Sequence, residues 1–136
     1  MASIYLGGTF YQFTVEQVRA RQAILETKLL PHIKVLKPRH ADDYDSALAN
    51  HLDTTLTMRD KHLVSQADIV VLDMTECVKP PRGLLIETGW ATAWNIPVLA
   101  IIAPDSPYNF NMFKSLVTWQ LETHEQAALV INSVLG

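Results

Sequence analysis

Apolar and polar positions along this chain follow two different periods. Short continuous apolar runs, typical of parallel strands buried on both faces, alternate with segments whose apolar residues recur every three or four positions, as on one face of a helix. The predicted strands cover residues 3–8, 33–38, 67–74 and 97–104. The predicted helices cover residues 13–30, 54–66, 83–95, 111–116 and 123–135.

Local signals support these elements. Two predicted helices begin with a threonine followed three residues later by glutamine, the spacing of a capping box: Thr14 with Gln17, and Thr123 with Gln126. Residues 39–53 are polar and turn-rich, and we expect a long surface loop there. Because strands and helices alternate without repeats or linkers, the sequence predicts a single α/β domain over residues 1–136, with a mainly parallel sheet of four to five strands.

A parallel sheet also predicts where chemistry occurs. Ligands of such sheets bind outside the carboxyl ends of the strands. The segments at these ends are YLGGTF, LKPRH, LDMTECVKPPRG and IIAPDSPYN. We expect the functional residues among them and on the helices that follow.

Composition narrows the function classes. The formal charge is −3 and the basic residues are scattered, so we expect no binding of long nucleic acid. The one cysteine, Cys77, allows no internal disulfide and fits a reducing compartment. Because no histidine motif supports Cys77 as a nucleophile, we interpret it as an incidental thiol. We see neither a signal peptide nor an apolar run of about 18 residues, and therefore expect a cytoplasmic protein without a membrane span.

One carboxylate stands out in the segment GLLIETGWATAWNIP. Glu87 is its only ionisable side chain, and on a helical wheel it lies in an aromatic sector beside Trp94 and between Trp90 and Ala91. Two interpretations remain open. Glu87 stabilises the helix N-terminus from the first turn, or it is a functional carboxylate in an apolar site.

A second carboxylate occupies a comparable position. On the second predicted helix, Asp60 lies in the centre of the apolar stripe between Leu56 and Val64, with Arg59 on the opposite side. A charge there is costly unless it is partnered or faces a cavity. Pairing of Asp60 with a backbone group or a nearby cation is one interpretation. Because both acidic helices flank the strand predicted at 67–74, we favour a shared site with paired acids.

Paired carboxylates at the end of a strand support glycosidic chemistry. One carboxylate attacks or shields an anomeric carbon while the other orients the sugar or handles a proton. Metal binding is the rival use of two acids. It normally recruits histidine, and His62 points away from Asp60 on the wheel, so we predict no metal and no other cofactor.

Four blocks of the sequence together carry a family resemblance: IYLGGTF, MRDKHLVSQADIVVLDM, GLLIETGWATAWNIPVL and NMF. In this combination and order the chain resembles the nucleoside 2-deoxyribosyltransferases and the related deoxynucleoside monophosphate N-glycosidases. The resemblance implies a flavodoxin-like, doubly wound α/β sandwich. It also implies a homodimer or higher homo-oligomer in which a neighbouring subunit closes the active site.

The resemblance further implies three catalytic residues. Glu87 matches the nucleophilic glutamate of the G-x-x-x-E-x-G block, here Gly83 to Gly89, and would attack C1′ of the deoxyribose. Asp60 matches the aspartate that holds the sugar and assists protonation or activation. Tyr5 matches the first-strand tyrosine whose hydroxyl orients the nucleophile.

Substrate-binding residues are also implied. They match or stand near the family's binding positions: Gly7, Gly8, Thr9, Phe10, Asp73, Gly83, Asn111 and Met112. Phe10 is the candidate for stacking on the base. Pro81 replaces the acid with which the transferases recognise the base, and Asp73 is a candidate substitute. Phe110 replaces the family's amide, although Asn111 follows it directly.

These observations favour an N-glycosyl enzyme acting on 2′-deoxynucleosides, with retention of configuration and transfer of the sugar to another nucleobase or to water. The alternatives are a hydrolase of 2′-deoxynucleoside 5′-monophosphates and a non-catalytic nucleotide-binding or sensing domain on the same fold. The expected partners are a deoxynucleoside or deoxynucleotide and a free nucleobase.

Overall fold

The computed structural model describes residues 1–8, 13–39, 43, 45–77 and 79–136. The strands are β1 (Ser3–Gly8), β2 (Lys34–Leu36), β3 (Ile69–Asp73), β4 (Val98–Ile101) and β5 (Trp119–Leu121). The helices are α1 (Val15–Glu26), α2 (Leu52–Gln66), α3 (Arg82–Ala93), α4 (Asn111–Leu116) and α5 (His124–Leu135), with a 3₁₀ helix η2 (Ser46–His51) before α2.

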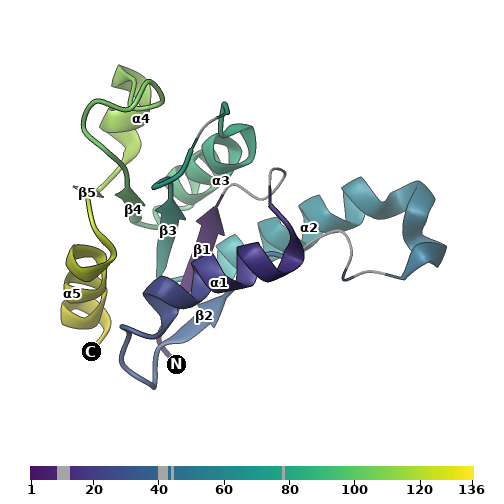
Figure 1. Ribbon diagram of the computed structural model, residues 1–136, viewed down its shortest axis with the longest axis horizontal. Helices are drawn as coiled ribbons and strands as arrows, with labels where there is room; N and C mark the ends of the chain where they lie inside the picture. The colour runs from purple at the N-terminus through teal and green to yellow at the C-terminus, as the bar shows by residue number, and fades with distance from the viewer. Residues whose placement is uncertain (9–12, 40–42, 44, 78) are drawn as a thin grey trace.

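The strands form one parallel sheet in the order β2-β1-β3-β4-β5 (Figure 1). This order places β3 at the centre, and the chain reverses its direction of winding between β1 and β3. In the register of β1, Tyr5 lies between Leu36 of β2 and Val70 of β3. The predicted flavodoxin-like, doubly wound α/β fold is confirmed.

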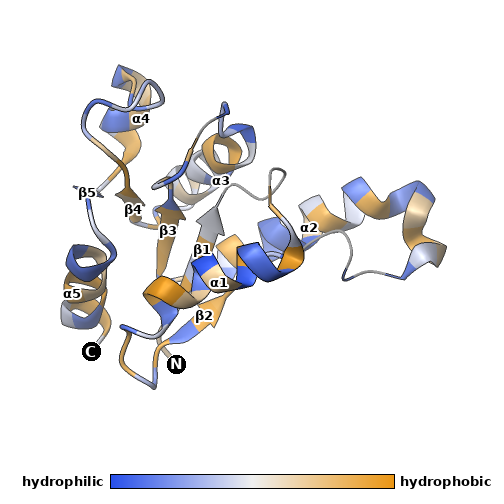
Figure 2. Cartoon of the chain, viewed as in Figure 1, coloured by the Kyte–Doolittle hydropathy of each residue, from blue (hydrophilic) through white to orange (hydrophobic). Residues whose placement is uncertain are grey.

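Helices cover both faces of the sheet because successive strand residues point to opposite sides. Tyr5 packs into the cluster that includes Val64 of α2 and Leu84 of α3. Ile4 and Leu6 pack on the other side, in the cluster formed with α1 and α5. Figure 2 shows β3 and β4 as hydrophobic strands at the centre of the molecule. Their fully buried positions explain the continuous apolar runs in the sequence.

Both capping boxes are present, at the start of α1 and of α5. The first helix is shorter than predicted: it ends at Glu26, and Thr27 caps it. Strand β5 was missing from the predicted segments. It has three residues at the sheet edge, none fully buried, so it lacks the apolar run that marks β3 and β4.

The prediction that residues 39–53 form a loop is wrong in part, because η2 and the first residues of α2 lie there. Asp45 starts η2: its side chain accepts a hydrogen bond from the Ala47 amide at 2.8 Å. Figure 1 shows η2 and the N-terminal end of α2 extending away from the sheet. We call this segment, residues 46–58, the arm.

None of the described helices is long and apolar enough to cross a membrane.

Candidate active site

The side chains of Tyr5 and Glu87 meet between the sheet and α3. Tyr5 is fully buried, and its hydroxyl donates a hydrogen bond to Glu87 Oε1 at 3.0 Å. Glu87 is only 8% exposed. Because α3 begins at Arg82, Glu87 is its sixth residue, beyond the first turn. The interpretation of Glu87 as a first-turn charge at the helix end is therefore wrong.

The buried stripe of α3 differs from the predicted aromatic sector. It consists of Leu84, Glu87, Thr88 and Ala91, whereas Trp94 is 40% exposed. Thr88 can be buried because its hydroxyl donates to the Leu84 carbonyl at 2.7 Å, which satisfies the polar group inside the helix. Glu87 therefore faces the sheet, where it meets Tyr5.

Gly7 makes room for the second oxygen of Glu87. A Cβ atom at Gly7 would lie 2.6 Å from Glu87 Oε2 and 3.1 Å from a Leu84 methyl carbon. Glu87 Oε2 is buried and has no hydrogen-bond partner among the described residues. The carboxyl group is thus held by one oxygen and unpartnered at the other, beside the carboxyl end of β1.

Asp60 adds a second acid to this site from α2, which packs against α3. Its Oδ1 atom is buried and has no hydrogen-bond partner in the described part of the chain. The charge of Asp60 acts on both Tyr5 and Glu87. The structure therefore brings together the three predicted catalytic residues, and we call Glu87, Asp60 and Tyr5 the carboxylate cluster.

Burial changes the acid–base properties of the carboxylate cluster. Desolvation raises the pKa of Glu87 to about 8; the Tyr5 hydrogen bond opposes this rise, and the Asp60 charge adds to it. Desolvation also raises the pKa of Asp60 to about 6, against the opposing charge of Arg59. Burial, followed by the charges of Glu87 and Asp60, raises the pKa of Tyr5 far above its usual range. Burial therefore favours the protonated form of Glu87.

The helical wheel placed Arg59 opposite the buried face of α2, and this prediction is wrong. Its side chain is half-buried, and its Nη1 atom donates to the Lys37 carbonyl at 3.1 Å. Sequence analysis did not identify it as a functional residue. Its position next to Asp60 in the sequence was the available signal.

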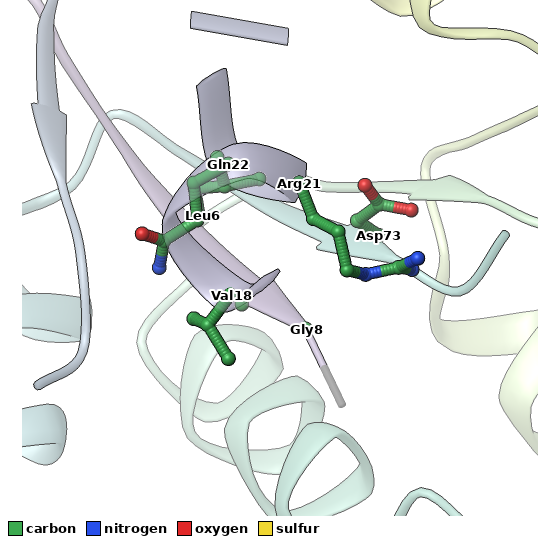
Figure 3. Close-up of a pocket in the computed structure, with 7 residues that line it drawn as sticks. Leu6, Gly8, Val18, Arg21, Gln22 and Asp73 are labelled. Carbon is green, nitrogen blue, oxygen red and sulfur yellow. The ribbon is translucent and has the colours of Figure 1, made fainter. Parts of the chain in front are cut away.

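On the other face of the sheet, Gly7, Gly8 and Asp73 line a small cavity together with Arg21 and Gln22 of α1. Figure 3 shows the charged groups of Arg21 and Asp73 on the same side of this cavity, with the Gln22 amide directed away from them. The cavity volume is about 10 Å³, roughly the space of one water molecule. A nucleobase therefore does not fit inside it.

Asp73 is already engaged at this cavity. Its Oδ1 atom accepts hydrogen bonds from the Thr75 amide at 3.1 Å and the Thr75 hydroxyl at 2.7 Å. Its Oδ2 atom lies 2.9 Å from His124 Nε2. These contacts join the end of β3 to the start of α5, and His124 is a partner that sequence reasoning missed.

The remaining predicted binding residues lie apart from the carboxylate cluster or outside the described residues. Gly83 lines an open pocket of about 330 Å³ at the start of α3, together with Lys79, Pro80 and Arg82. Asn111 and Met112 are exposed in the first turn of α4. Thr9 and Phe10 fall outside the described residues.

The other chemical interpretations find little support in the described segments. No group of three or more His, Cys, Asp or Glu side chains there could hold a metal ion. The Cys77 thiol donates to the Lys79 carbonyl at 3.3 Å, and burial raises the pKa of this thiol. A raised pKa disfavours the thiolate that a nucleophile needs.

Comparison with known proteins gives structural matches. The sequence itself matches no family model and no curated protein. The fold is similar to that of a 2-deoxyribosyltransferase from Bacillus psychrosaccharolyticus, with a TM-score of 0.68, 19% identity, and coverage of 93% of this chain and 90% of that one. This chain has the fold of that enzyme.

Two further solved structures share the fold. The CMP N-glycosidase BcmB of Clostridium botulinum matches with a TM-score of 0.51, 17% identity, and coverage of 98% of this chain and 99% of that one. A conserved protein of Enterococcus faecalis V583 matches with a TM-score of 0.50, 18% identity, and coverage of 100% and 89%. The family named by the sequence resemblance is thus represented among the proteins of the same fold.

Proposed function

We propose that this chain is a retaining N-glycosyl enzyme that cleaves 2′-deoxynucleosides through a covalent intermediate on Glu87. One observation carries the proposal: the Glu87 carboxyl is buried at the carboxyl end of β1, with Oε1 bonded to Tyr5 and Oε2 without a partner among the described residues. A carboxyl group that is fixed through one oxygen and desolvated at the other suits attack by the second oxygen on an electron-poor carbon.

In the first step, ionised Glu87 attacks C1′ of the deoxyribose. A bond forms between the carboxylate oxygen and C1′ while the bond from C1′ to the base nitrogen breaks. The electron pair of the broken bond goes to the base nitrogen, and the base takes up a proton from water as it leaves. The product is a glycosyl ester on Glu87 with inverted configuration at C1′.

In the second step, a nitrogen of another nucleobase, or a water molecule, attacks C1′ of the ester. The ester bond breaks, its electron pair returns to the Glu87 carboxylate, and the acceptor loses a proton. The second inversion restores the original configuration. Transfer and hydrolysis differ only in the acceptor, so the same carboxylate cluster serves both.

Tyr5 and Asp60 have different roles in this mechanism. The Tyr5 hydroxyl orients Glu87 by its 3.0 Å hydrogen bond. Asp60 has an unpartnered oxygen that can accept a hydrogen bond from a sugar hydroxyl, and its charge favours the cationic character that develops at C1′. The 2-deoxyribosyltransferase with the same fold supports deoxyribose as the sugar.

A second candidate function is hydrolysis of the N-glycosidic bond of 2′-deoxynucleoside 5′-monophosphates. The open pocket at the start of α3 favours it, since Lys79 and Arg82 line this pocket and cations suit a phosphate group. The fold match to a CMP N-glycosidase points the same way.

A substrate panel tests the proposal. The protein is incubated with each 2′-deoxynucleoside and each 5′-monophosphate, with and without a second free base, and the products are separated by chromatography. We expect base exchange or free base from the deoxynucleosides. Release from monophosphates alone would favour the second candidate, and no release from any substrate would leave the binding domain as the better account.

A further inference from the structure

Arg59 lies at the edge of the carboxylate cluster without belonging to it. Its guanidinium donates to the carbonyl of Lys37, the residue directly after β2. The last residue of β2, Leu36, pairs with Tyr5 in the sheet. The guanidinium is therefore anchored one residue beyond the strand partner of Tyr5, at the same end of the sheet as Glu87.

The charges around Asp60 give this position its significance. The charge of Asp60 acts on Tyr5 of β1 and on Glu87 of α3, and ionisation of either group adds negative charge near Asp60. Arg59, on α2 itself, is the cation that acts on Asp60 and lowers its pKa against the effect of burial. The same cation also acts on Tyr5. Neighbouring Lys61 and His62 are exposed.

We propose that Arg59 is a positioning residue that keeps Asp60 ionised inside the site and fixes the turn of α2 that presents it to Glu87. The anchor on the Lys37 carbonyl holds the positive charge in place, and the charge favours the carboxylate form of Asp60. The inference rests on the proposed function in one respect: the role of Asp60 in holding the sugar comes from that function.

Two substitutions separate the charge of Arg59 from its anchor. Arg59→Gln removes the charge and keeps an N–H donor for the Lys37 carbonyl. Arg59→Lys keeps the charge on a flexible stem without the guanidinium fork. Arg59→Met is a second neutral variant, to be used if the glutamine variant does not fold. Lys61→Gln is the matched control, because it removes a cation from the exposed side of the same helical turn.

The first readout needs no substrate. Carbon NMR of labelled aspartate side chains follows the titration of Asp60, whose signal is assigned by its loss in Asp60→Asn. In wild type the midpoint should lie near the pKa of about 6. We expect the midpoint to rise in Arg59→Gln or Arg59→Met, and to stay near wild type in Arg59→Lys and Lys61→Gln. An unchanged midpoint in a folded neutral variant overturns the proposal, whether or not the protein is an enzyme.

The second readout is the pH profile of kcat/KM on whichever nucleoside the protein accepts. We expect Arg59→Gln to lose activity most strongly at acidic pH and to recover part of it as pH rises, since Asp60 then ionises without help. Arg59→Lys should keep most of the wild-type kcat/KM at acidic pH. A loss that is equal at all pH values, and not rescued by lysine, would show a purely structural role and contradict the proposal. Absence of turnover on every substrate would contradict the proposed function while the NMR titration still decides on Arg59.

Discussion

At the residue scale, Glu87 differs from an ordinary surface carboxylate in both its solvation and its bonding. In water a carboxylate accepts several hydrogen bonds, whereas within the described residues Glu87 accepts one, from Tyr5, and it is almost fully buried. The uncharged form is therefore favoured, and its pKa rises to about 8. The proposed reaction needs the charged form, so pH should control both activity and stability through this one group.

Activity should increase with pH through the range in which Glu87 ionises. We expect kcat/KM to rise with pH up to the Glu87 pKa of about 8 and to level off only above that pKa, since the proposed nucleophile is the ionised carboxylate. The measurement is kcat/KM against pH on a deoxynucleoside whose base does not titrate in this range. A profile that is flat from pH 5 to pH 9 would contradict an ionising Glu87 in the reaction.

Stability should change with pH in the opposite direction. The unfolded chain releases the Glu87 proton near the ordinary glutamate pKa of 4.5, while the folded protein keeps it up to about pH 8. Between these values the folded state binds more protons, so its free energy of unfolding falls as pH rises. We expect Glu87→Gln, which keeps a partner for the Tyr5 hydroxyl, to flatten this fall by up to about 1.4 kcal/mol per pH unit. Urea titrations at several pH values measure the free energy of unfolding of wild type and variant. If the two free energies change with pH in parallel, Glu87 is not a buried, protonated group.

At the element scale, the closeness of β1 and α3 makes the site possible. Gly7 of β1 lies against Glu87 of α3, and a Cβ atom there would come within 2.6 Å of Oε2. A contact this short forces one of the two groups to move, and the end of a flexible side chain moves more readily than a central strand. The carboxyl group is therefore the part displaced by any side chain at position 7.

Gly7→Ala should separate activity from folding. We expect the variant to fold, with kcat/KM reduced roughly 100-fold or more, because about 1 Å of misplacement of a reacting group costs that much. Gly89→Ala is the matched control, since nothing lies within 4 Å of a Cβ built there in α3. That control should keep its activity and gain about 0.5–1 kcal/mol of helix stability. Kinetics and thermal melting measure both variants, and full activity of Gly7→Ala would contradict the geometry of the site.

The sequence predicted most elements because the central strands are buried on both faces and the capping boxes are local. It also predicted Asp60 and Glu87 as partners, since charged residues on apolar helix faces are rare. The face of α3 was misjudged because Trp94 is half-exposed and a satisfied Thr88 is buried in its place. The space requirement at Gly7 could not be predicted, since it depends on the distance between two elements that are 80 residues apart in the chain.

At the scale of the whole molecule, the parallel sheet gathers the carboxyl ends of all the described strands at one edge, and several elements carry exposed apolar side chains. Met58 on the arm, Ile86 on α3 and Met112 on α4 are each more than half exposed. A contiguous apolar patch, rather than single exposed side chains, marks a surface that another chain covers. The homo-oligomer that the family resemblance implies stays a prediction, and we expect these three side chains to be covered in it.

Light scattering coupled to gel filtration tests this prediction. At micromolar concentration we expect a dimer or a larger assembly of the 136-residue chain. Met58→Glu on the arm should weaken the assembly, because a charge at a covered apolar position must be desolvated. Glu16 is already a charged, exposed residue on α1, and its replacement by Gln serves as the control. A wild-type monomer with full activity would contradict the prediction.

The central claim is that Glu87 forms a covalent bond to the sugar, and trapping that bond tests it most directly. A deoxynucleoside with a good leaving group is mixed with the protein, quenched with acid within the first turnovers, digested and analysed by mass spectrometry. We predict one added deoxyribosyl group on the peptide that contains Glu87, and its absence in Glu87→Ala, a variant that should fold but lose several orders of magnitude in turnover. An adduct on another residue, or wild-type activity in Glu87→Ala, would contradict the account.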